Sequence, residues 1–451
     1  MKKRGISTAL LLLALVWCPA AQAEEGAADL SEHGEHQWET VSSAAATCGE
    51  AGFTLLRCGV CHEEKYRRDD PATGEHHFGE TGACDVCGYV EMAALTQEEA
   101  LAQHGFYLED ADESGTYTTG DVVWFGQYPQ RLLTEDDAAY ALLQAEGEDL
   151  ADGWTSFSYY SEGEISDYMF YKDVTVDGRA YRGVYLLNYR PYYTGLPAGP
   201  DASYIDDEGY ELGKAYWFEF APIAWNVLEY RDGCLLLNAK YCLDAQPFQA
   251  LYEGNRSKMV IPGTEILTND WEASSVRAFL NGPFSQLAFT QDEQQMIQPT
   301  QLNNRTTGYE PCAKFQITQN DTEDKVFLLS YEDVMNPDYG YPEKSSFDLE
   351  TNGNSINDVP EAFQRRRSYT AYATIQGCRS STQGVTADGE PACYYMLRSA
   401  GNLKFSITGV SKYGSASYSG SMNPTSKASQ DGLSFNGDFG LLPALRVKVG
   451  Q

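Results

Sequence analysis

From about Gly120 to the C-terminus, short apolar runs alternate with turn residues, and this pattern limits the folds open to the chain. Runs rich in aromatic and β-branched residues and bounded by Gly, Asn, Asp or Pro are typical of strands. The runs that fit best are 181–187, 216–220, 223–228, 234–237, 326–329 and 445–449. Because helices do not alternate regularly with them, the pattern predicts an α+β domain rather than a doubly wound parallel sheet.

Three segments are predicted to be helices. In two of them, 96–106 and 290–297, an initial Thr is followed by Glu three residues later, which is the spacing of a capping box. The third, 269–280, places its large apolar residues on roughly one face. We therefore expect strands to dominate and a few helices to interrupt them.

The N-terminus has the organisation of a secretory signal peptide. Residues 2–4 are basic, residues 6–17 form an apolar run, and Ala21-Gln22-Ala23 supplies small residues for cleavage. The apolar run is shorter than the roughly 20 residues that span a bilayer, and no later segment is predicted to span one. We expect a secreted or extracytoplasmic protein.

The charge balance excludes one large class of partner. The chain carries 65 acidic and 32 basic side chains, for a formal net charge of −33. Such an excess repels phosphate backbones and anionic lipid headgroups. We expect no binding to nucleic acid.

The distribution of histidine limits the chemistry of the main domain. All six histidines lie at or before His104. The later residues therefore cannot by themselves build a Ser-His-Asp triad, a Cys-His pair or a histidine-ligated metal site. A pair of carboxylates could still catalyse glycoside hydrolysis, although no particular pair stands out.

Residues 24–92 form a Cys/His-rich module with little that resembles a packed core. It contains two C-x-x-C sequences, Cys58 to Cys61 and Cys84 to Cys87, and two such turns can close a tetrahedral zinc site. The module is therefore predicted to be zinc-ribbon-like, with Cys58, Cys61, Cys84 and Cys87 as ligands of a structural zinc. Disulfides are the alternative, since an exported chain meets an oxidising compartment.

The same module resembles a bacterial extracytoplasmic repeat. The matching residues are His36-Gln37-Trp38, Thr47-Cys48, the first C-x-x-C, Ala72-Thr73-Gly74 and His76-His77. The resemblance implies a spacer or recognition module. It also makes His36, Cys48 and His77 alternative metal ligands.

An acidic loop after the first predicted helix has the oxygen spacing of an EF-hand calcium loop. Asp110, Asp112, Ser114 and Asp121 fall at ligand positions, and a glycine occupies position 6. Position 12 is Asp rather than Glu, however, and a strand is predicted to follow. An acidic surface turn is therefore the alternative to calcium.

The main domain carries a series of motifs in a fixed order. They are DVVWFGQYPQ (121–130), FEFAPIAWNVL (218–228), WEASSVRAFLNGPFSQLAF (271–289), residues 327–330, TAYA (370–373), YYMLRS (394–399) and LPAL (442–445). Together, residues 118–449 resemble a bacterial exported domain of unknown function whose usual forms read WWLRS and VRPAL. This chain departs from that pattern at Tyr394-Tyr395-Met396 and at Leu442.

That family is similar to the C-type-lectin-like and sulfatase-modifying-factor folds. The resemblance implies a twisted antiparallel sheet beside two helices. A lectin's calcium site does not carry over, because Ala392 follows Glu390-Pro391 and no Trp-Asn-Asp occurs. The expected organisation is a signal peptide (1–23), the Cys/His module (24–92), a helix and acidic linker (93–117) and the lectin-like domain (118–449).

The main domain contains five cysteines, an odd number, so at least one does not pair within it. Cys234 with Cys242 and Cys378 with Cys393 are plausible bridges, which would leave Cys312 single. With no histidine nearby in the sequence, we expect a structural role for Cys312.

These features favour an exported, non-catalytic binding protein that recognises a glycan or a surface protein. The 31 tyrosines suit stacking on sugar rings, and they suit core packing equally. The alternative is a carboxylate-based polysaccharide hydrolase.

Overall fold

The computed structural model describes residues 37–48, 52–60, 64–68, 73, 76–77, 84, 86, 96–111, 117–146, 153–157, 169–186, 209–249, 260–261, 263–304, 319–342, 364–378, 384–401, 407–417 and 439–449. They divide into two compact units. The N-terminal unit contains residues up to 45 together with 52–69, and the large unit contains 46–51 and 70–451. The predicted signal peptide lies outside the described residues.

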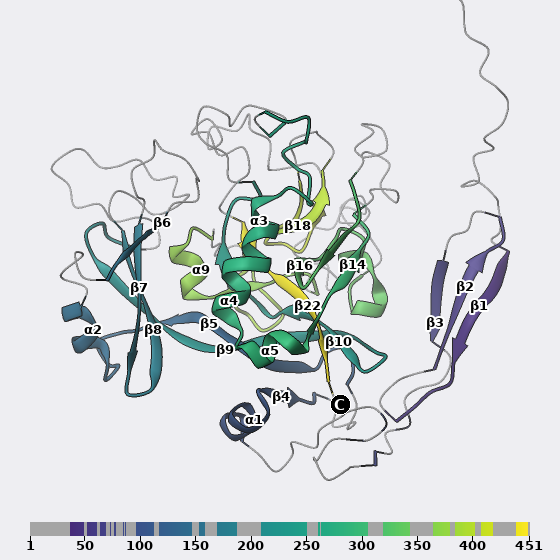
Figure 1. Cartoon of the computed structure of the whole chain (residues 1–451), viewed down its shortest axis with the longest axis horizontal. Coiled ribbons are helices and arrows are strands. Elements are labelled where there is room, and N and C mark those ends of the chain that lie inside the picture. Colours follow the sequence, from purple (N-terminus) through teal and green to yellow (C-terminus); the bar gives the residue numbers. More distant parts are fainter. Residues whose placement is uncertain are drawn as a thin grey trace, which may run out of the picture. The chain divides into compact units, whose positions relative to one another are not determined.

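The described part of the N-terminal unit is a three-stranded antiparallel sheet in the order β1-β2-β3 (Figure 1). Its strands are β1 (Trp38–Ala44), β2 (Phe53–Cys58) and β3 (Glu64–Arg68). Cys58 ends β2, and the next two residues form a turn. This places the first predicted C-x-x-C at the exit of a strand.

The large unit is built around β9, a strand of 17 residues that pairs along its length with β8, β5 and β10 in turn. Ten of the described strands form this main sheet, and their pairings are antiparallel. They are β4 (Phe106–Glu109), β5 (Val122–Leu132), β6 (Thr155–Phe157), β7 (Met169–Val176), β8 (Arg179–Leu186), β9 (Ala215–Arg231), β10 (Cys234–Ala239), β13 (Ile297–Gln298), β16 (Val326–Leu328) and β22 (Pro443–Lys448).

Smaller sheets complete the large unit. A second sheet runs in the order β12-β21-β18-β19-β20, and two further pairs are β11 with β17 and β14 with β15. Their bounds are β11 (Tyr241–Cys242), β12 (Asp244–Ala245), β14 (Thr300–Leu302), β15 (Thr322–Asp324), β17 (Ser368–Tyr369), β18 (Tyr395–Ala400), β19 (Ile407–Val410), β20 (Ala416–Ser417) and β21 (Gly440–Leu441).

The helices of the described residues are all short. They are α1 (Gln97–His104), α2 (Tyr140–Glu146), α3 (Ser275–Phe279), the π-helical turn η2 (Leu280–Phe284), α4 (Ser285–Ala288), α5 (Gln291–Met296), the 3₁₀ turns η3 (Asp333–Met335) and η4 (Pro337–Tyr339), and α9 (Ala371–Ile375). Within the described part of the chain, no helix has the length and apolar character needed to cross a membrane.

Both predicted capping boxes are confirmed. The Thr96 hydroxyl accepts the Glu99 N–H at 3.2 Å, and the Glu99 carboxylate accepts the Thr96 N–H at 2.9 Å. Thr290 and Glu293 make the same reciprocal pair at the start of α5. These bonds satisfy backbone donors that the first helical turn leaves unpaired.

Two elements differ from their predictions. The runs 216–220 and 223–228 belong to one strand, β9, because β5 continues to pair across Pro222 with a bulge on its own side. The predicted helix 269–280 begins only at Ser275, because Ser274 caps it and residues 270–273 form a turn. It then continues through η2, which contains Pro283. Proline lacks the N–H of an α-helical hydrogen bond, so the helix widens there.

Candidate functional site

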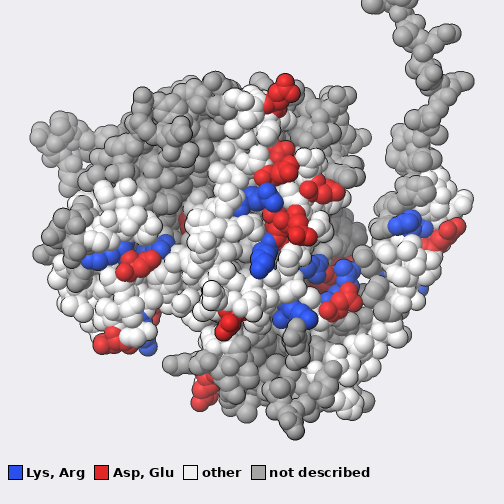
Figure 2. Space-filling model, in the orientation of Figure 1, with Lys and Arg blue, Asp and Glu red and all other residues white. Residues whose placement is uncertain are grey.

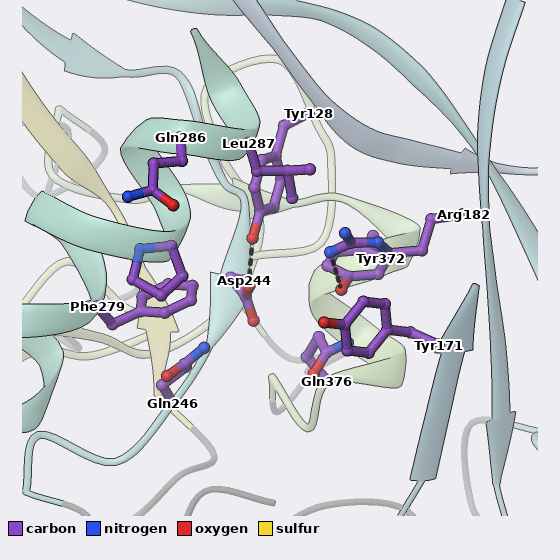
Figure 3. A pocket seen from close by; sticks show the side chains of 11 residues that line it. Tyr128, Tyr171, Arg182, Asp244, Gln246, Phe279, Gln286, Leu287, Tyr372 and Gln376 are labelled. Carbon is purple, nitrogen blue, oxygen red and sulfur yellow. Dashed lines mark hydrogen bonds between the residues drawn. The ribbon is translucent and has the colours of Figure 1, made fainter. Parts of the chain in front are cut away.

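A pocket of about 320 Å³ opens in the large unit between the η2–α4 helical segment and strands β7 and β8 (Figure 3). Its floor is polar and buried, and its rim is more exposed and combines two aromatic rings with other apolar and polar side chains. The floor residues are Tyr128, Asp244, Gln246, Tyr372 and Gln376. The rim residues are Tyr171, Arg182, Phe279, Pro283, Gln286 and Leu287.

Asp244 is the carboxylate of the floor and is only 3% exposed. The Tyr128 hydroxyl donates to Oδ2 at 2.6 Å, and the Ala245 N–H donates to Oδ1 at 2.7 Å (Figure 3). Burial raises the pKa of Asp244 to about 7, although both hydrogen bonds oppose that rise. Near neutral pH this carboxyl group is therefore present in both its neutral and its charged form.

In Figure 3 the Arg182 guanidinium lies over Tyr372, and its Nη1–H donates to the Tyr372 hydroxyl at 3.5 Å. It makes a two-pronged ion pair with Asp173, at 2.7 and 2.6 Å, and its guanidinium lies 4.8 Å from the centre of the Tyr171 ring. Burial alone would lower the pKa of Arg182, but the Tyr372 hydroxyl and the Asp173 carboxylate hold it above its usual value. Arg182 is therefore a fixed cation whose charge Asp173 already balances.

The helical side of the rim depends on the π turn. Phe279 ends α3, Pro283 lies inside η2, and Gln286 and Leu287 follow on α4. Single π turns inside helices occur often at functional sites, because the extra residue redirects the side chains around it. Here all four side chains line one pocket.

The three glutamines and the carboxyl, hydroxyl and guanidinium groups offer donors and acceptors to a ligand, while the rings offer flat apolar surface. Few polar groups set within an aromatic wall are typical of small-molecule sites. The pocket therefore suits a small ligand that has hydroxyl groups and a compact ring.

A second hollow, of about 480 Å³, lies over α3 and β14–β15 and is lined by Glu272, Glu323 and Asp324 together with Arg277 and Lys325. Its carboxylates are hydrogen-bonded to neighbouring side chains: Glu272 accepts a hydrogen bond from the Asn320 amide, and Glu323 accepts one from the Gln301 amide. On the face seen in Figure 2, acidic and basic side chains lie next to one another over this region. The hollow is therefore a surface of mixed charge, with three acidic and two basic side chains.

The tryptophans of the sequence motifs hold the fold together. The Trp225 Nε1–H donates to the Phe125 carbonyl at 2.8 Å, and the Trp271 Nε1–H donates to Asp324 at 3.0 Å. Both side chains are fully buried. A large ring with its polar atom satisfied is a core residue.

The motif arginines and Tyr395 also have internal partners. Arg277 pairs with Asp324 at 2.6 Å, and Arg398 pairs with Asp333 at 2.7 Å. The Tyr395 hydroxyl donates to the Arg365 carbonyl at 2.8 Å. These contacts give the set a structural role in the fold.

The predicted zinc ligands are only partly described. Cys58 belongs to the N-terminal unit, and its Sγ accepts the Val60 N–H at 3.4 Å, while Cys84 belongs to the large unit. Cys61, Cys87 and the alternative ligand His36 lie outside the described residues.

Of the other alternative ligands, Cys48 lies beside Cys84, whereas His77 is exposed. The histidine that joins the two thiols is His76, the residue before the predicted one. The ligands brought together thus differ from the predicted set.

The predicted calcium loop is described at its two ends. Asp110 and Asp121 are described, while Asp112 and Ser114 lie outside the described residues. The buried Asp121 carboxylate accepts the Ala111 N–H at 3.0 Å and the Thr118 N–H at 2.7 Å. Its oxygens are thus already bonded to backbone donors, and β5 follows directly. Calcium binding stays a prediction.

Among the described cysteines of the main domain none is joined in a disulfide, and Cys242, Cys378 and Cys393 gather in the core. The Cys393 Sγ lies 3.4 Å from the Cys242 Sγ, and both are fully buried. Cys378 lies close by, since a Cβ added at Gly440 would meet both Cys242 and Cys378. Cys234 is on β10 and half-buried, and Cys312 lies outside the described residues.

The pocket was not predicted from the sequence. Tyr128 and Tyr372 fall inside quoted motifs, but Asp244, Arg182 and Gln246 lie in segments with no distinctive pattern. A buried Asp following a short apolar strand was the one available signal, and 65 acidic residues obscured it.

No curated protein and no solved structure matches this chain. The C-type-lectin-like fold and the extracytoplasmic repeat therefore stay predictions. One family model does match, and it begins within β10 and ends after β22. The match includes Asp244 and Tyr372 but not Tyr128, Tyr171 or Arg182. The ordered motifs predicted a domain of unknown function over residues 118–449, and the family match confirms this for the later part of that range. Residues 236–449 are a DUF6273 domain, a domain of unknown function.

Proposed function

We propose that the chain is a non-catalytic binding protein whose pocket takes a small neutral polyol, such as one sugar unit of a glycan. The observation that carries the proposal is a polar floor beneath a rim that carries the rings of Tyr171 and Phe279. Sugars combine hydroxyl groups with an apolar ring face, and these surfaces meet hydrogen-bonding and aromatic side chains respectively. The volume of about 320 Å³ is at the small end of ligand sites.

The charges of the site favour a neutral ligand. Asp173 already neutralises Arg182, and Asp244 is partly protonated near pH 7. The chain as a whole is strongly acidic, with a formal charge of −33, so anionic ligands would be repelled on approach. A polyol has no charge to desolvate and can use each polar group of the floor.

The arrangement of carboxylates supports binding rather than hydrolysis. Glycoside hydrolysis uses two carboxyl groups on either side of the scissile bond. Among the described residues that line the pocket, Asp244 supplies the one carboxylate. A site of this size also suits a single ring better than a flat protein surface. The signal peptide predicted at 1–23 would place the site where external glycans occur.

The test is direct titration of the chain without residues 1–23 against neutral mono- and oligosaccharides by calorimetry. Gln286→Ala removes one rim hydrogen bond and should weaken binding about 3- to 10-fold. Tyr171→Ala should weaken it by a similar factor because it removes a stacking surface. Gln301→Ala, on β14 and outside the pocket lining, is the matched control and should bind normally.

Two results would count against the proposal. If no saccharide in a broad panel binds, the pocket has another ligand. If oligosaccharides are cleaved and Asp244→Asn abolishes the cleavage, the hydrolase alternative is correct.

A further inference from the structure

Three soft metal-ligating side chains of the large unit converge outside the pocket. They are Cys48, His76 and Cys84, and their ligand atoms all lie within 4.8 Å of one another. The two Sγ atoms are 3.6 Å apart. These residues come from three separate places in the sequence, so their meeting is a property of the fold.

The distance between the sulfurs matches that of two ligands on one metal ion. Zinc–sulfur bonds of about 2.3 Å at tetrahedral angles place two thiolates roughly 3.8 Å apart. A disulfide would place the sulfurs about 2.05 Å apart. The observed separation of 3.6 Å excludes a disulfide and is close to that of a chelating pair, and the His76 ligand atom lies within 4.8 Å of both sulfurs.

The surroundings hold these residues in place. The Thr73 N–H donates to the Thr47 carbonyl at 2.8 Å, which ties the segment before His76 to the segment of Cys48. Tyr230 of β9 packs against both cysteines, and its ring meets Tyr117 edge-on at 4.8 Å. The ligands are thus braced against the central strand of the main sheet.

The burial of the three residues suits a stable but accessible site. Cys48 is 6% and Cys84 3% exposed, whereas His76 is half-buried. A protein environment around the sulfurs slows their oxidation and exchange, while the imidazole side leaves a route for an ion. Among the described residues, Tyr230 is the one apolar side chain packed against this pair of cysteines, so an ion would add cohesion there.

We infer that Cys48, His76 and Cys84 bind one zinc ion, and this inference does not depend on the proposed function. Two thiols release their protons on binding and become thiolates, and the imidazole binds in its neutral form. Thiolate and imidazole ligands favour zinc over calcium or magnesium. Three protein ligands leave a fourth tetrahedral position for water or another side chain. The ion is structural and fastens the segments around residues 48, 76 and 84 to one another.

The experiment measures the zinc content of the chain without residues 1–23, purified in the presence of zinc and then dialysed. We expect about one zinc per chain. Cys48→Ser, Cys84→Ser and His76→Ala should each lose most of it. His77→Ala changes the neighbouring, exposed histidine and should keep the ion. Zinc that is lost in His77→Ala but kept in His76→Ala would overturn the inference.

A second measurement uses the unmodified sequence, in case the variants fail to fold. Cobalt in place of zinc should give the thiolate-to-metal charge-transfer absorption of two sulfurs, and a chelator should make two thiols newly reactive. Metal-free protein in which a Cys48–Cys84 disulfide is found by peptide mapping would overturn the inference. So would a site that needs Cys58 but not Cys48, since that is the ligand set predicted from the C-x-x-C spacing.

Discussion

Asp244 both lines the pocket and makes the stability of the protein depend on pH. Its pKa rises from 3.8 to about 7 because it is buried, so the fold favours its neutral form. The stabilisation that the neutral group provides is complete below pH 4, where the unfolded chain is also protonated. It is lost as the pH rises from about 4 to about 7, because the unfolded chain ionises in this range and is thereby favoured, whereas the folded chain keeps the carboxyl group neutral.

We therefore expect Asp244→Asn to be more stable than the natural chain above pH 7 and equally stable below pH 4. One pKa unit corresponds to about 1.4 kcal/mol, so the difference could reach about 4 kcal/mol. An asparagine keeps an acceptor for the Ala245 N–H and can donate to Tyr128, as the neutral acid can. Urea denaturation at pH 4, 6 and 8 measures this difference.

Asp177→Asn is the control, since it removes one carboxylate in the exposed turn between β7 and β8. Its free energy of unfolding should differ from that of the natural chain by a similar small amount at all three pH values. If Asp244→Asn also shows no dependence on pH, the carboxyl group at the floor of the pocket is not held neutral.

At the scale of elements, the contact between β5 and α4 depends on one glycine. Gly126 lies in β5 with φ at +69°, and a Cβ there would come within 2.5 Å of the Phe289 ring and 2.8 Å of the Ala288 carbonyl. The Phe289 ring stacks on Phe125 and on Trp225 of the neighbouring strand. Because Gly126 has no side chain, α4 and Phe289 can pack closely against β5. This packing positions the helical segment that forms one side of the pocket.

Gly126→Ala should lower the free energy of unfolding by about 3 kcal/mol or more, because it adds a steric conflict to an unfavourable φ. Gly178→Ala is the matched control, since Gly178 has φ at +81° but no atom within 4 Å of its would-be Cβ. It should cost only about 1 kcal/mol. Urea midpoints compare the two variants, and equal losses would mean that the contact with Phe289 contributes nothing.

At the scale of the whole molecule, the matched range 236–449 does not enclose its own core. Rings from earlier residues pack against later ones: Tyr128 meets Phe284 and Tyr372, and Phe218 also meets Tyr372. In addition, β10 pairs along one edge with β9, which precedes the matched range. The DUF6273 domain and the strands before it therefore form one folding unit.

From this we expect residues 236–451 alone to aggregate or to lack a cooperative unfolding transition, because removing β5, β8 and β9 exposes apolar surface and a strand edge. Residues 93–451 keep those strands and should unfold cooperatively. Thermal unfolding followed by near-ultraviolet circular dichroism, together with gel filtration, compares the two. A monomeric 236–451 fragment with a sharp transition would show that the matched range folds by itself.

Local signals in the sequence were sufficient for some of the elements. The helices that begin at Thr96 and Thr290 follow from a capping box, which is written in four consecutive residues. Strands β8, β10, β16 and β22 follow from apolar runs bounded by turn residues. The late start of α3 was missed because the turn before it depends on side-chain bonds that a helical pattern of apolar residues does not reveal.

What the sequence by itself determined is therefore the strand-rich character of the large unit, the starts of α1 and α5, and the order of motifs in the region that contains residues 236–449, since these depend on neighbours in the chain. Only the tertiary structure decided which distant groups meet: Tyr128 with Asp244 across 116 residues, Cys393 with Cys242 across 151, and Cys48 with Cys84. Such meetings depend on strand register and on the packing of separate elements, and shifting one strand by a single residue would turn its side chains to the other face. No local sequence pattern specifies which distant residues come into contact, because the free energy that favours one packing arrangement comes from burial across the whole core.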